Sequence, residues 1–403
     1  MNMQDARSTS LLPLAELLAK LEPDIERLRP LVDSYITGER IARYLKVLAD
    51  TPAPSTAASA MRAPVLRELL EGDGAHGKRL ALDANHGNTG NTVILTGSAA
   101  GSKPLWYFAH LDTISYLAGP ADGDRQPLVP FCYHLTQDGR RDALCYRFDL
   151  QCARYMVAAD GFLESEAGRP YFRPNNPGFR LVSGDRVVPV TSCAPDADGH
   201  WTGHFDNAGG VAALAVAAPV LAEAGFDAML ALPDEEEGPH GSGNQVIGRG
   251  GSRLIDRLPP PDLALVADMQ QAGDNAGLGS TDNNTVRLGK GAVLSEFSSL
   301  GRGAVTPPHL LGLARHLVRL IDRRGVKVQE PQNSYTSRSD DVSVMLKTPN
   351  ILLLGFPGLD RHFDTGLPKA NPRDIVDLSK ALVYAALLRP IIRTMSDQSR
   401  SVR

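Results

Sequence analysis

Three successive carboxylates form the part of the sequence with the clearest chemical potential. Glu235, Glu236 and Glu237 follow the apolar run Asp227–Leu232 and Pro233, and a turn rich in Gly and Pro comes next. The run has the length of a strand, and a buried strand that ends in an acidic loop holds that loop where ligands gather. An isolated Glu triplet is more often a solvated loop. Its interpretation therefore depends on the residues that accompany it.

Other potential metal ligands stand at similar points of the chain, after strand-like runs or before a helix. They are His110 with Asp112 after Pro104–Ala109, Asp206 before Gly210–Ala224, Asp268 after Leu263–Ala267, and His362 beyond Ile351–Phe356. A His-x-Asp pair at a strand end suits a metal ligand and the carboxylate that orients it, although the motif alone is common by chance.

Together these residues suit two divalent ions. The set is His110, Asp206, Glu235, Glu236, Asp268 and His362. Imidazole and carboxylate ligands favour zinc, with cobalt or manganese as alternatives. Five ligands for two three-ligand sites require one bridging carboxylate, and the carboxylate that remains is available for proton transfer. In a two-metal hydrolase the ions activate a water and polarise the scissile carbonyl, and a nearby Glu passes the proton to the leaving amine.

The surrounding elements predict an α/β fold with a mixed sheet flanked by helices. The expected strands are Arg79–Ala84, Thr92–Thr96, Leu105–Ala109, Asp227–Leu232, Asp262–Ala267, Val326–Glu330 and Ile351–Gly355. The expected helices are Ala57–Glu71, Val211–Ala224, Ser252–Leu258, Pro308–Arg324 and Asp374–Leu388. Residues 116–202 instead contain short β-like pieces punctuated by Gly, Pro and Asp, which predicts a small inserted β domain.

This insertion makes the catalytic domain discontinuous, over residues 41–115 and 203–395. Helical spacing runs through residues 11–46, and Pro23 and Pro30 are expected to divide this stretch into two or three helices, of which residues 1–40 form an N-terminal extension. We expect this extension to be ordinary amphipathic packing. The segment 396–403 is expected to be a disordered tail.

Composition excludes several classes of function. The chain has 403 residues, a net charge of −4 and no basic stripe, so nucleic acid is not an expected partner. No apolar run approaches the ~20 residues that span a bilayer, which predicts no membrane segment, and the polar N-terminus favours the cytoplasm. The cysteines are Cys132, Cys145, Cys152 and Cys193. Without a CxxC pair or secretion signal, free thiols are expected rather than a zinc site or disulfide.

The order of these motifs resembles a known family. His-x-Asp, Asp-Asn, Glu-Glu-x-Gly, Asp and His occur in this order in the co-catalytic dimetal aminopeptidases, and the chain is most similar to the tetrahedral (TET) aminopeptidases, which include glutamyl and deblocking aminopeptidases. These also insert a β domain between the first His and the bridging Asp. The resemblance covers roughly residues 42–390 and includes Thr51-Pro-Ala-Pro-Ser55, Val286-Arg-Leu-Gly-Lys-Gly291, Gln329, Ser339-Asp340 and Arg361-His362.

The resemblance implies a role for each site residue. His110 and Asp268 would bind one metal, Glu236 and His362 the other, and Asp206 would bridge them. A cis peptide bond often follows the bridging Asp in the family. Glu235 would be the general base and Asp112 would orient His110. This register takes Glu237 as the x of Glu-Glu-x-Gly; a shift by one residue would give the two glutamate roles to Glu236 and Glu237.

The chain also departs from the family pattern. Thr113 stands where many relatives have an acidic residue, Asp206-Asn-Ala-Gly is closer to the leucine-aminopeptidase branch, and the motif around Arg361-His362 is hybrid. The first 40 residues have no recognised counterpart. These departures leave substrate preference and assembly open.

Three functions are consistent with the residues. The first is a dimetal aminopeptidase that removes N-terminal residues from peptides. The second is a metal-dependent deacylase or carboxypeptidase, but those enzymes insert a domain after the glutamate pair rather than before Asp206. The third is an inactive scaffold, which would usually have lost a ligand or the base. Relatives assemble through the inserted domain into dimers and dodecamers, so a homo-oligomer is expected.

Overall fold

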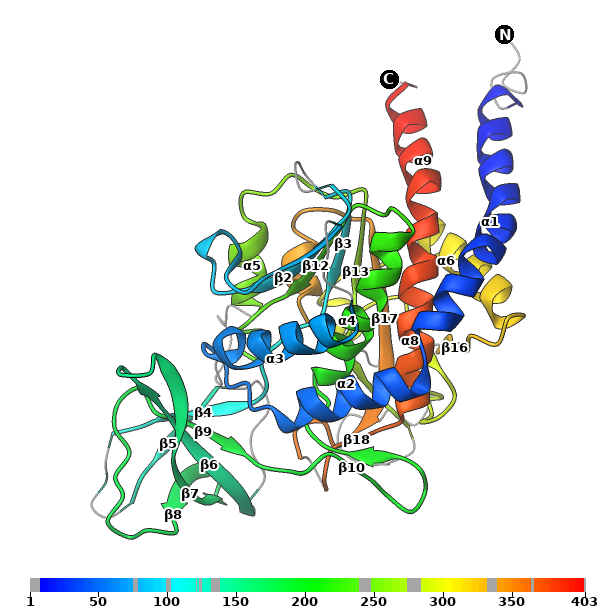
Figure 1. The fold of residues 1–403 in the computed structure, drawn as a ribbon. Helices are drawn as coiled ribbons and strands as arrows, with labels where there is room; N and C mark the ends of the chain where they lie inside the picture. The colour runs from blue at the N-terminus through cyan, green and yellow to red at the C-terminus, as the bar shows by residue number, and fades with distance from the viewer. Residues whose placement is uncertain are drawn as a thin grey trace.

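A large mixed sheet with helices on both faces forms the body of the protein (Figure 1). The computed structural model describes residues 8–74, 79–98, 103–120, 122, 125–131, 138–238, 248–273, 284–331, 339–363 and 366–401. The strand order along the main path is β1-β2-β12-β3-β13-β17-β18-β11-β10. These strands are β1 (Leu80–Asp83), β2 (Thr92–Thr96), β3 (Leu105–Phe108), β10 (Ala194–Pro195), β11 (Trp201–Thr202), β12 (Ala228–Leu232), β13 (Leu263–Val266), β17 (Ile351–Leu359) and β18 (Lys369–Ala370).

The centre of this sheet is parallel, with β12, β3, β13 and β17 side by side. All residues of β3 are buried, because Leu105 and Tyr107 enter one core while Trp106 and Phe108 enter another on the opposite face. Burial on both faces explains why such strands are almost continuously apolar. The short strands β14 (Met269–Gln271), β15 (Ala292–Ser295) and β16 (Val328–Gln329) join at this side of the sheet.

Helices cover both faces of the sheet. They are α2 (Gly38–Asp50), α3 (Ala58–Gly72), α4 (Ala208–Glu223), α5 (Arg249–Ile255), α6 (Pro308–Asp322), α7 (Asp341–Val344) and α8 (Pro372–Ala385), with short 3₁₀ turns at His86–Asn88, Ser299–Gly301 and Ala386–Leu388. Helix α4 is almost wholly buried and packs against α2 and α8. The predicted α/β class is confirmed, and none of the described helices is long and apolar enough to cross a membrane.

A second sheet forms a separate lobe at the lower left of Figure 1. Its strand order is β5-β4-β9-β6-β7-β8, and every neighbouring pair is antiparallel. The strands are β4 (Ser115–Ala118), β5 (Leu128–Phe131), β6 (Gly139–Asp149), β7 (Arg154–Glu166), β8 (Arg169–Pro174) and β9 (Arg186–Pro189). The strands β10 and β11, also expected within the insertion, instead extend the main sheet, because β11 pairs with β18 and β10 pairs with β11.

Two helices cover residues 11–46, as expected, but the break between them falls at residues 36–37 and not at a proline. A single helix, α1 (Ser8–Tyr35), runs through both Pro23 and Pro30. Both prolines are exposed, whereas Ile25 and Val32 are fully buried in the main core. Packing on the inner side therefore outweighs the loss of two backbone N–H donors on the outer side, where water can satisfy the freed carbonyls.

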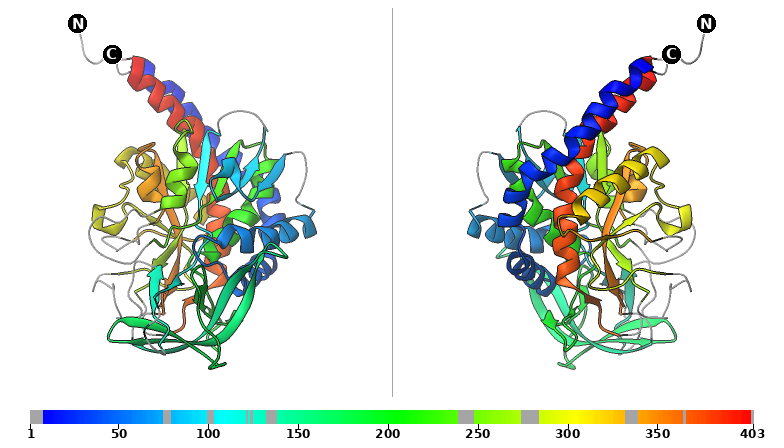
Figure 2. Two further views of the ribbon diagram at one scale, coloured as in Figure 1. Left: turned by 90° about the vertical axis from the view of Figure 1, so that its left-hand side faces the viewer. Right: turned by 90° about the vertical axis from the view of Figure 1, so that its right-hand side faces the viewer.

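The C-terminus also differs from the expectation. Helix α9 (Arg389–Ser401) continues through most of the segment expected to be a disordered tail. Its described part packs against α1, and the two helices project together from the body (Figure 2). Cys145, Cys152 and Cys193 are free thiols, and Cys132 lies outside the described residues.

Candidate active site

Two histidines and a bridging carboxylate form the centre of the site. His110 and Asp268 follow β3 and β13, Asp206 precedes α4, and His362 lies on a turn after β17. One carboxylate oxygen of Asp206 is 3.1 Å from His110 Nε2 and the other is 3.2 Å from His362 Nε2. The peptide bond from Asp206 to Asn207 is cis, as the resemblance implied. The parallel strands β3 and β17, which lie on either side of β13, thus bring two histidines that are far apart in the sequence to one carboxylate.

The glutamates complete the cluster in the second of the two registers. A carboxylate oxygen of Glu237 is 3.2 Å from His362 Nε2, and one of Glu236 is 3.6 Å from His110 Nε2. Asp268 lies 3.7 Å from the same atom of His110. Possible ligand atoms of His110, Asp206 and Glu237 all lie within 4.8 Å of one another.

Glu235, the general base of the first register, points away from this cluster. Its φ is +64°, and its carboxylate forms ion pairs with Arg249 at 3.2 Å and Arg253 at 2.5 Å. The left-handed backbone at this residue turns its side chain outward while the next two side chains turn inward. This geometry favours the register of Glu236 and Glu237, in which the motif reads Glu-Glu-Gly and not Glu-Glu-x-Gly.

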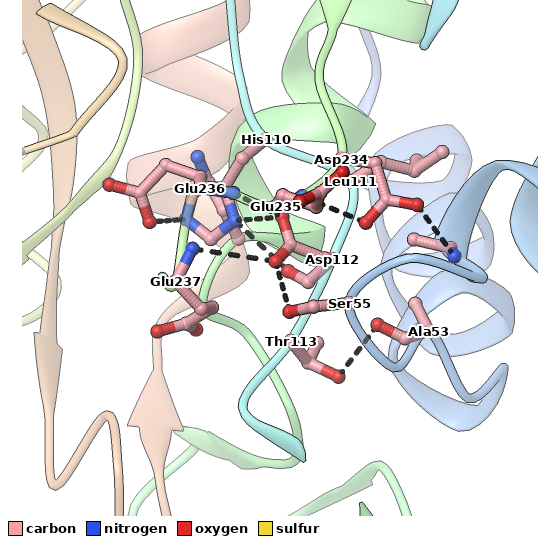
Figure 3. A network of polar contacts seen from close by, with 12 residues as sticks. Ala53, Ser55, His110, Leu111, Asp112, Thr113, Asp234, Glu235, Glu236 and Glu237 are labelled. Carbon is pink, nitrogen blue, oxygen red and sulfur yellow. Dashed lines mark hydrogen bonds and ion pairs between the residues drawn. The ribbon is translucent and has the colours of Figure 1, made fainter. Parts of the chain in front are cut away.

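Asp112 anchors the acidic loop more than it orients His110. The ring Nδ1 of His110 lies 2.9 Å from the backbone carbonyl of Asp112 and 3.6 Å from its carboxylate. That carboxylate accepts hydrogen bonds from Ser55 Oγ at 2.5 Å and from the backbone N–H groups of Glu236 and Glu237 at 3.0 and 3.4 Å (Figure 3). Asp112 thus fixes both glutamates relative to β3.

Two buried residues that the sequence analysis did not select, Asp234 and Arg62, also hold the loops that carry the site residues. Asp234, buried at the end of β12, accepts hydrogen bonds from the backbone N–H groups of Thr56, Ala58 and Glu235 (Figure 3). Arg62 of α3 is fully buried and donates to the carbonyl of Leu111 at 2.7 Å. The sequence shows that these residues are charged, but it does not show their hydrogen-bond partners, because most of the partners lie in distant segments that the fold brings together.

Burial and opposite charges shift the titration of the central groups. Burial lowers the pKa of His362, but the Glu237 carboxylate opposes this and the net pKa rises to about 9. For His110, burial is likewise outweighed by Glu236 and other carboxylates, and the pKa lies well above its ordinary value. Burial raises the pKa of Glu236 and of Glu237, whereas for Asp206 the two imidazoles overcome burial and hold the pKa well below its usual range.

The cluster has the composition that divalent ions require. Asp206, Glu236, Glu237 and Asp268 are at most 8% exposed, and Oε1 of Glu237 is buried without a hydrogen-bond partner. Buried carboxylates at this density need cations. Imidazole nitrogens and carboxylate oxygens, with no cysteine among them, fit zinc, cobalt or manganese.

Other histidines considered from the sequence lie elsewhere. His204 donates a hydrogen bond from Nε2 to the Pro189 carbonyl at 2.8 Å, and burial lowers its pKa to about 4. His309 is exposed on α6, and His240 lies outside the described residues.

Solved structures with the same fold include several aminopeptidases. The chain matches the Pyrococcus horikoshii TET1 peptidase with a TM-score of 0.64 and 18% identity, covering 86% of this chain and 99% of that one. An aminopeptidase from the archaeon Desulfurococcus kamchatkensis matches with a TM-score of 0.66 and 18% identity, and the match covers 88% of this chain and 97% of that one. A TET aminopeptidase from a marine-sediment Thaumarchaeota archaeon matches with a TM-score of 0.65 and 15% identity, and the match covers 86% of this chain and 95% of that one. No protein-family profile matches the sequence, and comparison with curated proteins gives no match.

These likenesses define the class of fold. The chain has the fold of the TET aminopeptidases, in agreement with the resemblance drawn from its motifs. The solved structures are covered almost from end to end, while 11–15% of this chain lies outside the matches, from 100 − 89 and 100 − 85. The chain therefore contains segments additional to the shared fold.

Proposed function

We propose that the protein is a dimetal aminopeptidase. The observation that carries this proposal is the position of Asp206, whose two oxygens each face a different imidazole at 3.1 and 3.2 Å. A carboxylate in that position is suited to bridge two ions. His110 and Asp268 would hold one ion, and Glu237 and His362 the other. The shared fold with solved aminopeptidases supports the same reaction class.

We propose that Glu236 carries out the proton transfer. Bound divalent ions would supply a water of lowered pKa and polarise the scissile carbonyl. Glu236 lies in the cluster, at 3.6 Å from His110, without belonging to the pair that faces His362. Its carboxylate would accept the proton of the attacking water and deliver it to the leaving nitrogen. Burial, which raises its pKa, favours holding that proton between the two steps.

A substrate screen tests this function. Purified protein with zinc, cobalt or manganese is assayed against aminoacyl-p-nitroanilides, unmodified peptides and the same peptides with N-acetyl caps. We expect metal-dependent release of single residues from free N-termini only. Activity confined to acylated or C-terminal substrates would favour a deacylase or carboxypeptidase, and no turnover after reconstitution would favour a scaffold.

Assembly is the second part of the proposal. A solved TET1 structure is a dodecamer, and the P. horikoshii TET1 peptidase assembles into a tetrahedron or a large octahedral shell. We infer that this chain also forms a homo-oligomer. Sedimentation velocity of the full chain gives the assembly size, and a monomer at micromolar concentration would contradict this inference.

Metal affinity should rise with pH. Below its pKa of about 9, His362 must lose a proton before it can accept an ion, and His110 is subject to the same requirement. Each imidazolium should therefore contribute up to roughly tenfold in apparent affinity per pH unit, and the contribution of His362 should end above about pH 9. Zinc titration against a competing chelator at pH 6, 7 and 8 measures this slope. An affinity independent of pH would show that neither histidine is a ligand.

The β domain should support the His362 loop. Arg141 of β6 donates to the carbonyl of Phe363 at 3.0 Å, and Phe363, with φ of +61°, follows His362 directly. Arg141→Met should weaken binding of the ion at His362 by about tenfold, the usual effect of losing an outer support. Arg140→Met is the matched control, because Arg140 instead lies over the Phe162 ring. Equal metal affinities of the two variants would refute this coupling.

A further inference from the structure

Glu235 is held in a strained backbone conformation between two arginines of α5. Its φ of +64° lies in the left-handed region, which disfavours a residue with a Cβ by roughly tenfold in population. Arg249 contacts one carboxylate oxygen of Glu235 at 3.2 Å, and Arg253 contacts the other at 2.5 Å. The side chain of Glu235 is only 13% exposed, so the arginines and not water compensate most of its charge.

Helix α5 lies directly against the acidic loop. The side-chain amide of Asn91 donates to the carbonyl of Gly250 at 2.9 Å, and its oxygen accepts from the backbone N–H of Asp234 at 3.0 Å. A Cβ added at Gly250 would lie 1.8 Å from the Asp234 carbonyl oxygen, so the two backbones are in contact. The arginines of α5 therefore start at a fixed distance from the loop.

Both arginines are themselves held by second contacts. Arg253 Nε donates to the backbone carbonyl of Thr89 at 3.2 Å. The guanidinium group of Arg249 lies 4.9 Å from the ring centre of Phe131, at the end of β5 in the inserted domain. A guanidinium group is attracted to the face of an aromatic ring at this distance. Arg249 thus joins the inserted domain to the acidic loop.

The conformation of Glu235 sets the direction of the two side chains that follow it. Glu237 faces His362 at 3.2 Å and Glu236 faces His110 at 3.6 Å. A return of φ at Glu235 to an ordinary negative value would rotate the chain beyond it by more than 100°, since φ in the allowed helical and extended regions is about −60° or lower. Both glutamates would then leave the histidines.

Two other loops that border the site have the same combination of features. Thr56 has a φ of +74°, and its hydroxyl accepts a hydrogen bond from Arg186 at 2.9 Å. Phe363 has a φ of +61°, and its carbonyl accepts one from Arg141 at 3.0 Å. In each loop an arginine from a distant segment contacts a left-handed residue that is not glycine. This repetition favours a role for the arginines in holding the backbone.

We propose that Arg249 and Arg253 are positioning residues that act through Glu235. They hold the acidic loop in the register that directs the next two glutamates to the histidines. The proposal rests on the dimetal function above and adds the groups that select which glutamates enter the site.

Replacing Glu235 by alanine and by glycine separates its conformation from its charge. Neither variant can contact the arginines, but glycine adopts a left-handed φ as readily as a negative one. In Glu235→Ala, kcat and the zinc affinity of one of the two sites should each fall about tenfold. In Glu235→Gly both should stay within about threefold of wild type. Glu235→Gln keeps an oxygen that accepts an arginine N–H and should also keep the register.

The arginines are tested by a double variant. Arg249→Met with Arg253→Met should reproduce the loss of zinc affinity, and adding Glu235→Gly should restore it. Arg315→Met on α6 is the matched control, because Arg315 is 41% exposed, against 44% for Arg253, and forms one ion pair at 3.0 Å. Zinc is titrated against a competing chelator well below the melting temperature. A purely structural role would lower the melting temperature and leave the affinity of the folded protein unchanged.

Two results would overturn the proposal. Wild-type zinc affinity in Glu235→Ala or in the double arginine variant would show that the loop keeps its register unaided. Equal losses in Glu235→Ala and Glu235→Gly would show that the carboxylate itself is required, and not the conformation.

A wild type that neither binds zinc nor hydrolyses peptides would instead contradict the dimetal function. Crystal structures of the two metal-free Glu235 variants then judge the proposal separately. We expect Glu237 to face His362 in Glu235→Gly and to have moved away from it in Glu235→Ala. The same position of Glu237 in both variants would refute the role of the arginines.

Discussion

Glu236→Gln should lower kcat by about a thousandfold while both metal ions stay bound. General base catalysis by a positioned carboxylate contributes roughly 10²–10⁴-fold, and an amide of the same shape cannot accept the water's proton. Metal content should persist because the carboxylates that face His362 are those of Asp206 and Glu237, and not that of Glu236. Steady-state kinetics with metal analysis of the same samples gives both quantities.

Glu235→Gln is the control for this prediction. Its carboxylate pairs with Arg249 and Arg253, away from the histidines, so kcat should stay within a few-fold of wild type. Substitution would remove these ion pairs and reduce stability only slightly, since the pairs are partly exposed. The opposite pattern, an inactive Glu235→Gln and an active Glu236→Gln, would favour the register in which Glu235 is the general base and Glu236 a metal ligand.

Asp206→Asn should weaken binding of both ions, by roughly a hundredfold or more. An ionised carboxylate that faces two metal sites neutralises charge in each, and an amide supplies neither the charge nor a second anionic oxygen. Zinc titration of the metal-free variant measures the loss in both sites, and turnover should fall with it.

Asp83→Asn is the matched control, because Asp83 forms an exposed pair with His86 at 3.0 Å. That substitution should leave zinc binding unchanged. Loss of one ion only in Asp206→Asn would show that Asp206 is a terminal ligand and not a bridge.

Much of the fold follows from local sequence patterns. The strands β3, β12 and β13 were predictable because continuous apolar runs of strand length end in polar residues, which is the pattern of a parallel sheet buried on both faces. The β insertion was predictable from its turn residues. The continuity of α1 through Pro23 and Pro30 was not predictable, because both prolines lie on its exposed side and their cost is offset by contacts with distant helices.

The sequence predicted most of the residues in the site but not which two of the three glutamates face the histidines. Motif order selected His110, Asp206, Asp268 and His362, which the structure brings together beyond the ends of β3, β13 and β17 and before α4. The choice among three adjacent glutamates depends on a left-handed φ at Glu235 and on the two arginines of α5, neither of which a motif encodes.

Anomalous scattering from crystals grown with zinc would test the central claim most directly. The account predicts two peaks per chain, about 3.5–4 Å apart, on either side of Asp206. One peak should contact His110 and Asp268, and the other Glu237 and His362. A single peak, or peaks that leave Asp206 uncoordinated, would contradict a dimetal site at this cluster.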